Sequence, residues 1–520
     1  MKTKRLAVLI LCTFLVIPLL LYSCKATDEK DENPTKAADK GSDSGDGNND
    51  TYGGETPAGS HEEMAGRADF MGYVFPEKDL DGYVFRIFNA TTFDDARWTS
   101  IEMTAECETG DPVNDAVYRR NILIEEKFNI TITEQIEERS IVGDKVNRAV
   151  MAGMDEWDAV VVGPVVCAPL AIRGIFTNLN TVASLNLDAP WWDQNARRSF
   201  ALDGALMFTA TDAHINNLGY MYITFNNKAI VQSLGLADLY QTVRDGKWTL
   251  DLMHDYARAA ARDLNGDGRF TGADQFGITT QIQVMLAFTI GMEFNPVTLD
   301  NRGHPELNPP NERFISGADK VRRFIDRPNG LFIGQEQLAE TPDMPAVFTE
   351  PVQFFASGGV LFYPDVLAAF WGLRNMDDDY GMIPIPKYDE SQEKYYSWMG
   401  IAAPTVMIPK SNLDPERTGL VLDALSAVSS TVLMDGFYEA TVLRKASRDE
   451  ESVEMLELVR ANRVFDIAAV YNWGNLFNGY RDNIYFLQGA SLMTVYERLE
   501  NATRAAIEET INVFRESNIE

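Results

Sequence analysis

The sequence is poor in cysteine, histidine and positive charge. Its 520 residues include four cysteines and four histidines, and 46 basic side chains stand against 77 acidic ones. The net charge of -31 argues against nucleic acid as a partner, because phosphates need a basic surface. It also argues against direct binding to anionic lipid, so we expect membrane contact to come from an anchor alone. The histidines form no close cluster that would predict a zinc site.

Catalytic motifs are missing as well. The chain has no Gly-x-Ser-x-Gly elbow, no His-Glu-x-x-His and no P-loop. Gly163-Pro164 and Gly358-Gly359 predict turns rather than phosphate cradles. Carboxylate pairs are too common in an acidic chain to indicate a glycosidase. We therefore expect a protein that is not an enzyme and requires no cofactor. A surface glycoside hydrolase and a surface adhesin without a transport role are the alternatives.

Long apolar runs are absent except at the N-terminus, where Leu6 to Leu21 follows a basic start. This pattern predicts a secretory signal over residues 1–23, too short to span a membrane and interrupted by Pro18. Cys24 comes directly after Ser23, which resembles a bacterial lipobox and predicts that Cys24 is lipidated. The alternatives are an ordinary signal peptide or an uncleaved anchor. We expect no later run to be long and apolar enough to span a bilayer.

The next segment, residues 24–71, nearly lacks aliphatic residues. It is rich in Asp, Glu, Lys, Gly, Ser, Asn and Thr, and it cannot bury enough apolar surface to offset the entropy of ordering. We expect a disordered, solvated stalk. Of the two cysteines in the remaining body, Cys107 and Cys167 either form a disulfide or are two buried thiols, because separation in sequence does not give distance.

About 450 residues follow the stalk, more than one compact core holds, so we expect two lobes. Apolar and β-branched runs predict strands at 81–88, 129–133 and 157–163, with helices between them from Asp111-Pro112 and around 146–154. This alternation predicts an α/β fold with a parallel sheet. Further strands are expected at 221–228, 358–365 and 380–386, the last at an edge or crossing between lobes because of its prolines.

Helical signals complete this outline. Thr249 is expected to cap a helix over 250–262. The C-terminus is expected to be helical, with one apolar stripe formed by Leu492, Val495, Leu499, Ala502, Ala506 and Val513.

Five segments in their order carry a resemblance to a known family. They are NDAVYRRN at 114–121, FNNK at 225–228, DGKWTLD at 245–251, DDDYGMIPIPKY at 377–388 and RDEESVEML at 448–456. The chain resembles the extracellular solute-binding lipoproteins of bacterial ABC importers, in the branch that contains maltose-binding protein. The resemblance covers nearly all of the body after residue 80.

The resemblance implies a two-lobed periplasmic-binding-protein-like fold with crossing hinge strands and a helical C-terminus. We expect a first lobe in residues 72–212, a second lobe in 213–395, and a return segment with C-terminal helices in 396–520. The family implies a solute, most often a sugar or oligosaccharide, that is bound between the lobes and delivered to an ABC permease. We expect a monomer, anchored by lipid on the extracellular face of the cell membrane.

Aromatic residues beside loop signals are candidates for stacking on sugar rings, and neighbouring carboxylates and amides for binding hydroxyls. For each aromatic residue alone, ordinary core packing is the alternative. Tyr363 and Asp365 stand out because they follow a predicted buried strand, where α/β sheets place ligands. The predicted binding residues are Asp94, Trp98, Asp212, Asn216, Tyr363, Asp365, Trp371, Tyr396, Trp398 and Trp473.

One segment fits the template of a calcium-binding loop. Residues 263–274 offer oxygen ligands at positions 1, 3 and 5, a glycine at position 6 and a carboxylate at position 12. The predicted ligands of a structural Ca²⁺ are Asp263, Asn265, Asp267, Arg269 through its backbone carbonyl, and Asp274. The alternative is a solvated Asx-Gly turn that follows a helix.

Overall fold

The computed structural model describes residues 70–91, 103–325, 329–338, 346–438, 450–486 and 489–517. Every described element belongs to one compact unit, Gly59–Glu520. The expected signal peptide, the lipidation site Cys24 and all but the last residues of the expected stalk lie outside the described residues. So do the predicted binding residues Asp94 and Trp98.

A four-stranded sheet forms the core of the first lobe. Its order is β12 (Thr405–Met407), β3 (Ala159–Val162), β1 (Tyr83–Thr91) and β2 (Ile130–Glu138). β1 pairs in parallel with β2 and β3, which confirms the predicted parallel α/β pattern, and β12 joins in the antiparallel direction. Asp111 caps α2 (Pro112–Phe128) as predicted, accepting from the backbone N–H of Val113 at 3.1 Å. α3 (Arg139–Met151) begins earlier than its apolar residues suggested.

A five-stranded sheet forms the core of the second lobe. Its order is β10 (Tyr380–Pro384), β4 (Tyr222–Asn227), β9 (Val360–Val366), β5 (Phe276–Thr280) and β8 (Phe332–Gly334). β5 runs parallel to β8 and β9, whereas β4 is antiparallel to both of its neighbours. β10 lies at the edge, as its prolines predicted. Thr249 caps α9 (Leu250–Ala260), accepting from the N–H of Leu252 at 3.3 Å.

Short segments of chain cross between the two lobes. Residues 213–221 lead from the first lobe into β4, and β11 (Ser397–Trp398) leads back toward β12. The two crossings meet where the N–H of Gly400 donates to the carbonyl of Tyr220 at 3.1 Å. β11 also pairs in parallel with β13 (Arg463–Val464). The expected crossings are therefore confirmed, but the first contains the short helix Asn216–Gly219 rather than a strand. The exact lobe boundaries stay a prediction.

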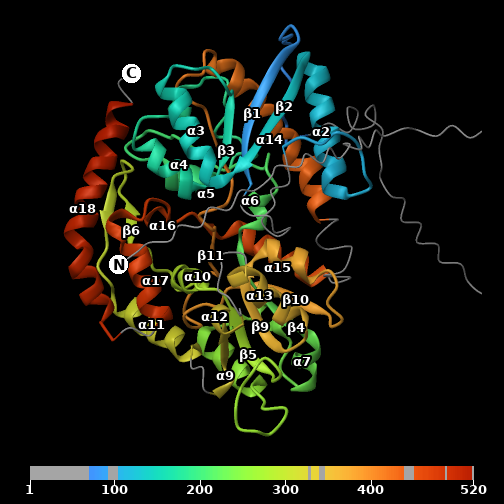
Figure 1. Cartoon of the computed structure of the whole chain (residues 1–520), viewed down its shortest axis with the longest axis vertical. Helices are drawn as coiled ribbons and strands as arrows, with labels where there is room; N and C mark the ends of the chain where they lie inside the picture. Colours follow the sequence, from blue (N-terminus) through green and yellow to red (C-terminus); the bar gives the residue numbers. More distant parts are fainter. Residues whose placement is uncertain are drawn as a thin grey trace, which may run out of the picture. The chain divides into compact units, whose positions relative to one another are not determined.

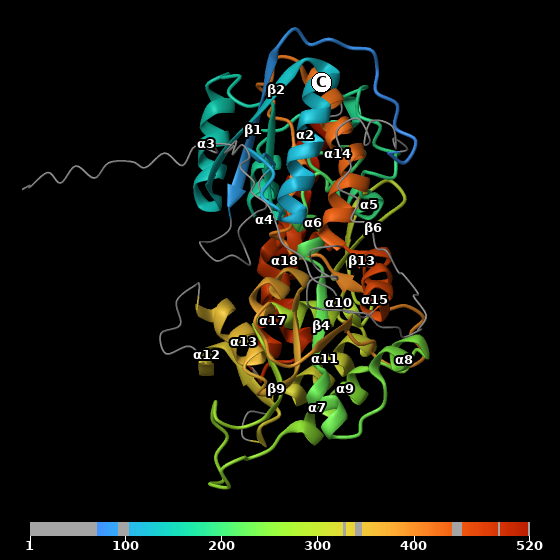
Figure 2. The same cartoon turned by 90° about the vertical axis from the view of Figure 1, so that its right-hand side faces the viewer.

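The two longest helices each differ from what the sequence predicted. α14 (Pro415–Tyr438) is long and apolar enough to span a membrane, contrary to our expectation for the body. However, 78% of its apolar window is buried inside the protein, and α14 lies beside α2 in both views (Figures 1 and 2). In α18 (Leu492–Glu516), Leu492 and Val495 are buried as predicted, but Ala502 is exposed and Ile507, Ile511 and Phe514 complete the buried face.

The remaining described elements surround the two sheets. They are α4 (Pro164–Ala171), η1 (Leu179–Thr181), α5 (Gln194–Phe200), α6 (Asn216–Gly219), α7 (Lys228–Ser233), α8 (Leu239–Arg244), α10 (Val284–Gly291), β6 (Val297–Leu299), β7 (Pro305–Leu307), α11 (Glu312–Phe324), α12 (Gln335–Leu338), α13 (Ala346–Ala356), η3 (Leu367–Leu373), α15 (Glu450–Ala461), α16 (Ile467–Tyr471), η5 (Trp473–Asn475) and α17 (Leu476–Tyr485). In the described part of the chain, Cys107 and Cys167 are separate thiols, and Cys167 is buried.

Candidate functional site

The carboxyl ends of parallel strands in the second sheet bring polar residues to one edge. β5, β8 and β9 all run in the same direction, so the residues that follow them emerge at the same edge of the sheet. This is where open α/β sheets bind ligands. Gln281 and Gln283 follow β5, Gln335 follows β8, and Asp365 lies near the end of β9. We call Gln281, Gln283 and Gln335 the glutamine edge.

Gln281 is held in place by three hydrogen bonds. Its Nε2 donates to the hydroxyl of Tyr222 at 3.1 Å and to the carboxylate of Asp365 at 3.3 Å. Its Oε1 accepts from the backbone N–H of Gln283 at 2.6 Å. The side chain of Gln335 accepts from the N–H of Ile282 at 3.0 Å, which ties the loop after β5 to the loop after β8. The buried Gln281 is thus fully hydrogen-bonded, and the partly buried Gln283 stands beside it.

α17 brings a cation to the same edge from far along the chain. Arg481 donates from Nη1 to Oε1 of Gln283 at 3.3 Å and from Nε to Asp482 at 2.7 Å. Tyr485, one turn later, donates its hydroxyl to Glu336 at 2.5 Å. Amides, a guanidinium group and a carboxylate therefore converge where β5 and β8 end. These groups are donors and acceptors of the kind that bind hydroxyl groups.

Tyr363 and Asp365 lie beneath the glutamine edge. Both side chains are fully buried, and the Tyr363 hydroxyl donates to the Asp365 carboxylate. Asp365 also accepts from the N–H of Val366 at 2.7 Å and from Gln281. The two residues predicted from the end of a buried strand are thus brought together, in a position that orients Gln281.

Several solved structures share this architecture. An ABC substrate-binding protein from Listeria monocytogenes in complex with cycloalternan matches with a TM-score of 0.52 at 10% identity, over 82% of this chain and 99% of that one. UgpB from Mycobacterium tuberculosis in complex with glycerophosphocholine matches with a TM-score of 0.52 at 13% identity, over 83% and 99%. A cyclo/maltodextrin-binding protein complexed with maltotetraose gives 0.51 at 11% identity, over 84% and 98%.

The chain has the fold of ABC solute-binding proteins. The expected two-lobed α/β architecture is confirmed by these matches. The matched proteins are binding proteins rather than enzymes. No protein-family model and no curated protein matches the chain.

In this solute-binding fold, one predicted tryptophan lies next to the glutamine edge and three other aromatic candidates do not. Trp398 is buried and stacks on Tyr222, the partner of Gln281, with ring centroids 4.9 Å apart. Trp473 is buried elsewhere, where its Nε1 donates to Thr510 at 2.8 Å.

The two remaining aromatic candidates are only partly buried. The Tyr396 hydroxyl donates to Glu293 at 3.2 Å. Trp371 lies 3.7 Å from the guanidinium of Arg374, measured to the ring centroid. Neither contact belongs to the glutamine edge.

Asp212 and Asn216 lie at the start of the first crossing. Asp212 is buried and pairs with Arg460 at 3.3 Å, and burial raises the pKa of its carboxyl above the ordinary value. Asn216 is buried at the start of α6, where its N–H donates to Nδ1 of His214 at 3.2 Å. Burial and the nearby Arg120 lower the pKa of His214 to about 3, which keeps this imidazole neutral. These residues belong to the hinge rather than to the glutamine edge.

The candidate calcium loop uses its side-chain oxygens on its own backbone. Asp263 accepts from the N–H groups of Gly266 and Gly268, both at 2.7 Å. Asn265 accepts from Asp267, Asp267 accepts from Arg269, and Asp274 accepts from Thr271, each at 2.8 Å. Among the described residues, no group of three or more His, Cys, Asp or Glu side chains could hold a metal ion. These contacts also suit the Asx-turn alternative, and calcium binding stays a prediction.

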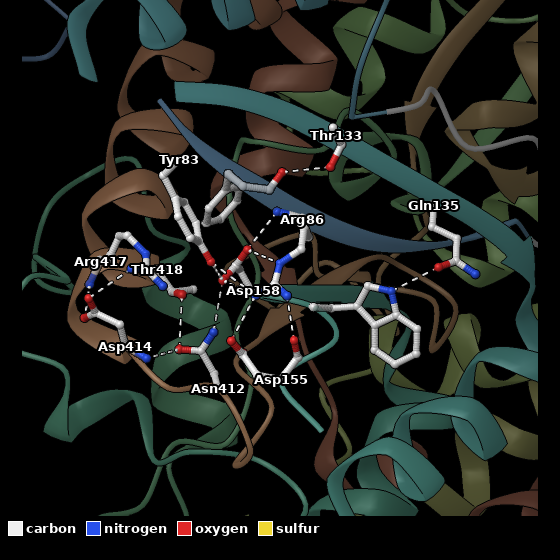
Figure 3. Close-up of polar contacts among 12 residues, drawn as sticks. Tyr83, Arg86, Thr133, Gln135, Asp155, Asp158, Asn412, Asp414, Arg417 and Thr418 are labelled. Atoms are coloured by element: carbon white, nitrogen blue, oxygen red, sulfur yellow. Dashed lines mark hydrogen bonds and ion pairs between the residues drawn. The ribbon is translucent and has the colours of Figure 1, made fainter. Parts of the chain in front are cut away.

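A hollow of about 550 Å³ lies in the first lobe, where β1 begins. Figure 3 shows the polar contacts of several residues that line it, among them Tyr83, Arg86 and Arg417. Its charged groups are already paired: Arg86 donates from Nε to Asp158 at 3.0 Å, and the guanidinium of Arg417 lies 3.6 Å from the centroid of the Tyr83 ring. The exposed Leu413 forms part of the rim. The hollow lies at the amino end of β1. Open α/β sheets bind ligands at the carboxyl ends of their strands, so this rule favours the glutamine edge and not the hollow.

Sequence reasoning missed the glutamine edge and Arg481. The run Phe276–Thr280 is a buried strand, and Gln281-Ile282-Gln283 follows it directly. Had this run been assigned as a strand, the rule that selected Tyr363 and Asp365 would have selected these glutamines as well. No local signal identifies Arg481, because its role depends on where α17 packs.

Proposed function

We propose that the protein is an extracellular solute-binding protein that captures a sugar or oligosaccharide at the glutamine edge and delivers it to an ABC permease. The observation that carries this proposal is the convergence of Gln283, Gln335 and Arg481 at the carboxyl ends of β5 and β8. Uncharged amides and one guanidinium suit a neutral polyhydroxylated solute. Two of the matched proteins were solved with oligosaccharides, which supports the same class of ligand.

The mechanism follows from the two lobes and their crossings. A solute that contacts both lobes binds the closed arrangement more tightly than the open one, and this difference shifts the equilibrium between them. The permease would then recognise the closed arrangement. We propose that lipidated Cys24 holds the protein at the extracellular face of the membrane. Cys24→Ser should then release the protein from the membrane fraction of a bacterial host.

The hydrogen bonds that the carboxylates near the edge already accept favour binding without catalysis. A glycosidase needs two carboxyl groups, about 5 to 10 Å apart, that face the substrate. Asp365 is fully buried and accepts from Tyr363, Val366 and Gln281. Glu336 accepts from the Tyr485 hydroxyl. These contacts orient the edge, and we propose no catalytic role for them.

Thermal shift and calorimetry against mono-, di- and oligosaccharides and polyols test the function. At least one sugar should stabilise the protein saturably and be recovered without cleavage. Arg481→Ala should weaken its affinity about tenfold, roughly 1.4 kcal/mol. Arg504→Ala is the matched control, because Arg504 is an exposed arginine paired with Glu500 on α18. No stabilisation by any sugar or polyol would refute the proposal, and recovery of cleaved sugar would favour a glycoside hydrolase.

A further inference from the structure

One face of α15 is attached to the second lobe. α15 packs against the edge strand β10, and Ser452 shares a 2.9 Å hydrogen bond with Tyr240 of α8. Arg244 of α8 pairs with Glu451 at 2.8 Å and with Glu454 at 2.6 Å. Met455, Leu456 and Val459 of the helix are buried. α15 therefore moves with the second lobe.

A second row of side chains reaches the first lobe instead. Glu457, Arg460 and Arg463 are spaced three residues apart, on α15 and on β13 that follows it. The row meets the first lobe in three contacts: the Tyr438 hydroxyl donates to Glu457, Arg460 pairs with Asp212 at 3.3 Å, and Arg463 pairs with Asp193. Figures 1 and 2 both place α15 near one end of α14, the helix that ends at Tyr438. We call these three contacts the interlobe seam.

The first-lobe partners are fixed firmly in their own lobe. Asp193 caps α5, accepting from the N–H groups of Asn195 at 2.8 Å and Ala196 at 2.9 Å. The N–H of Asp193 donates to the carbonyl of Ala210 at 3.1 Å. Asp212 is held by its own N–H, which donates to the carbonyl of Trp191 at 3.4 Å. Asp212 cannot follow α15 if the lobes move apart, so lobe movement must stretch or break its pair with Arg460. Arg463 lies on β13, and the nearby Phe465 packs on Phe200 of α5, so its pair with Asp193 anchors this end of the seam in the first lobe.

The two ion pairs of the seam are largely out of water. Asp193, Asp212 and Arg463 are all buried. Among the described residues, the Nε and Nη1 atoms of Arg463 have no hydrogen-bond partner. Charges in such surroundings interact strongly, and removal of one partner leaves the other uncompensated.

From this geometry we propose that the interlobe seam is an ionic latch that sets the balance between two lobe arrangements. Asp212 and Arg460 are its positioning residues, and they act on solute affinity without touching the solute. The latch rests on the proposed function insofar as lobe movement serves solute capture. A population shift changes apparent affinity by the fraction of molecules in the competent state. Weakening the latch therefore changes affinity at a distance.

Spin-label distance measurements on the solute-free protein test the latch directly. Labels at Met151→Cys on α3 and Ile315→Cys on α11 report the separation of the lobes, since both side chains are exposed. A Cys107→Ser background leaves the buried Cys167 as the remaining thiol of the described body. We expect Arg460→Gln to shift or broaden the distance distribution and to change the affinity for the best sugar at least fivefold. Arg460→Lys, which keeps the charge, should restore most of both.

Arg244→Gln is the matched control, because it removes the same kind of charge pair from α15 within the second lobe alone. Its distance distribution should equal that of the parent. If Arg460→Gln fails to fold, Tyr438→Phe weakens the exposed end of the seam instead. An unchanged distribution in Arg460→Gln, or an equal change in Arg244→Gln, would overturn the latch. A shifted distribution in a protein that binds no sugar would support the latch and refute the proposed function.

Discussion

The guanidinium group of Arg120 donates a 2.7 Å hydrogen bond to the backbone carbonyl of Ala213, at the start of the first crossing. The same group donates to the carbonyl of Met103 at 2.6 Å and to the Ser429 hydroxyl at 3.1 Å. Arg120 is fully buried on α2, and burial lowers its pKa to about 10. One side chain therefore ties together α2, α14 and the hinge.

Replacement of Arg120 should be severely destabilising. Arg120→Met keeps much of the volume but leaves the buried carbonyl of Ala213 without this donor. It also takes one of two donors from the carbonyl of Met103, which still accepts from Asn121 at 2.9 Å. We expect a loss of about 3 to 5 kcal/mol in unfolding free energy. Urea denaturation measures it. Arg119→Met is the control, because Arg119 is a partly exposed neighbour paired with Glu108, and it should cost under about 1 kcal/mol. Equal losses in the two variants would contradict the role assigned to Arg120.

Gly163 allows the second crossing to pass close to the first sheet. A Cβ atom at this position would lie 2.7 Å from the backbone of Ala402. Gly163→Ala should therefore push residues 401–403 away and cost about 1 to 3 kcal/mol by overpacking. Gly272→Ala is the matched control, since nothing lies within 4 Å of its Cβ position. Thermal denaturation compares the two, and similar melting temperatures would show that the crossing adjusts at no cost.

Asp466 should make stability depend on pH. It caps α16, accepting from the N–H of Ala469 at 2.7 Å, and burial raises its pKa from 3.8 to about 7. The folded protein therefore holds this proton more tightly than the unfolded chain does. Its contribution to stability is complete below about pH 4 and is lost as pH rises through about 7. Asp466→Asn keeps the cap and removes the titration.

The measurement for Asp466 is urea denaturation at pH 5 and pH 8. The unfolding free energy of Asp466→Asn minus that of the parent should be larger at pH 8 than at pH 5. This comparison cancels the other carboxyl groups, which are common to both proteins. A difference that does not change with pH would rule out titration of Asp466 in this range.

The calcium prediction concerns the loop from Asp263 to Asp274. If the ion binds there, it neutralises clustered carboxylates, so chelator should lower the melting temperature and added calcium should restore it. Asp267→Ala should abolish this response while leaving sugar affinity nearly intact. A melting curve that does not change in excess chelator would contradict calcium binding. The loop would then be only the set of turns that its backbone contacts form.

Local sequence patterns determined several elements of this fold, although not β5 and β8. Asp111 and Thr249 cap their helices because short polar side chains reach the N–H groups of the first turn wherever a helix begins. The prolines of 380–386 put β10 at an edge because proline cannot donate to a ladder. The buried end of β9 pointed to Asp365, which does lie beneath the glutamine edge. These outcomes depend on neighbours in the chain, so the sequence alone is enough.

Only the tertiary structure decided which distant side chains meet. Trp398 and Trp473 carry similar local signals, yet Trp398 stacks on Tyr222 beside the glutamine edge while Trp473 bonds to Thr510 on α18. Arg481 reaches Gln283, some 200 residues earlier, because α17 packs against α10. The buried face of α18 likewise depends on what it packs against, as the exposed Ala502 shows. Periodicity gives the faces of an element, but only packing selects the partner of each face.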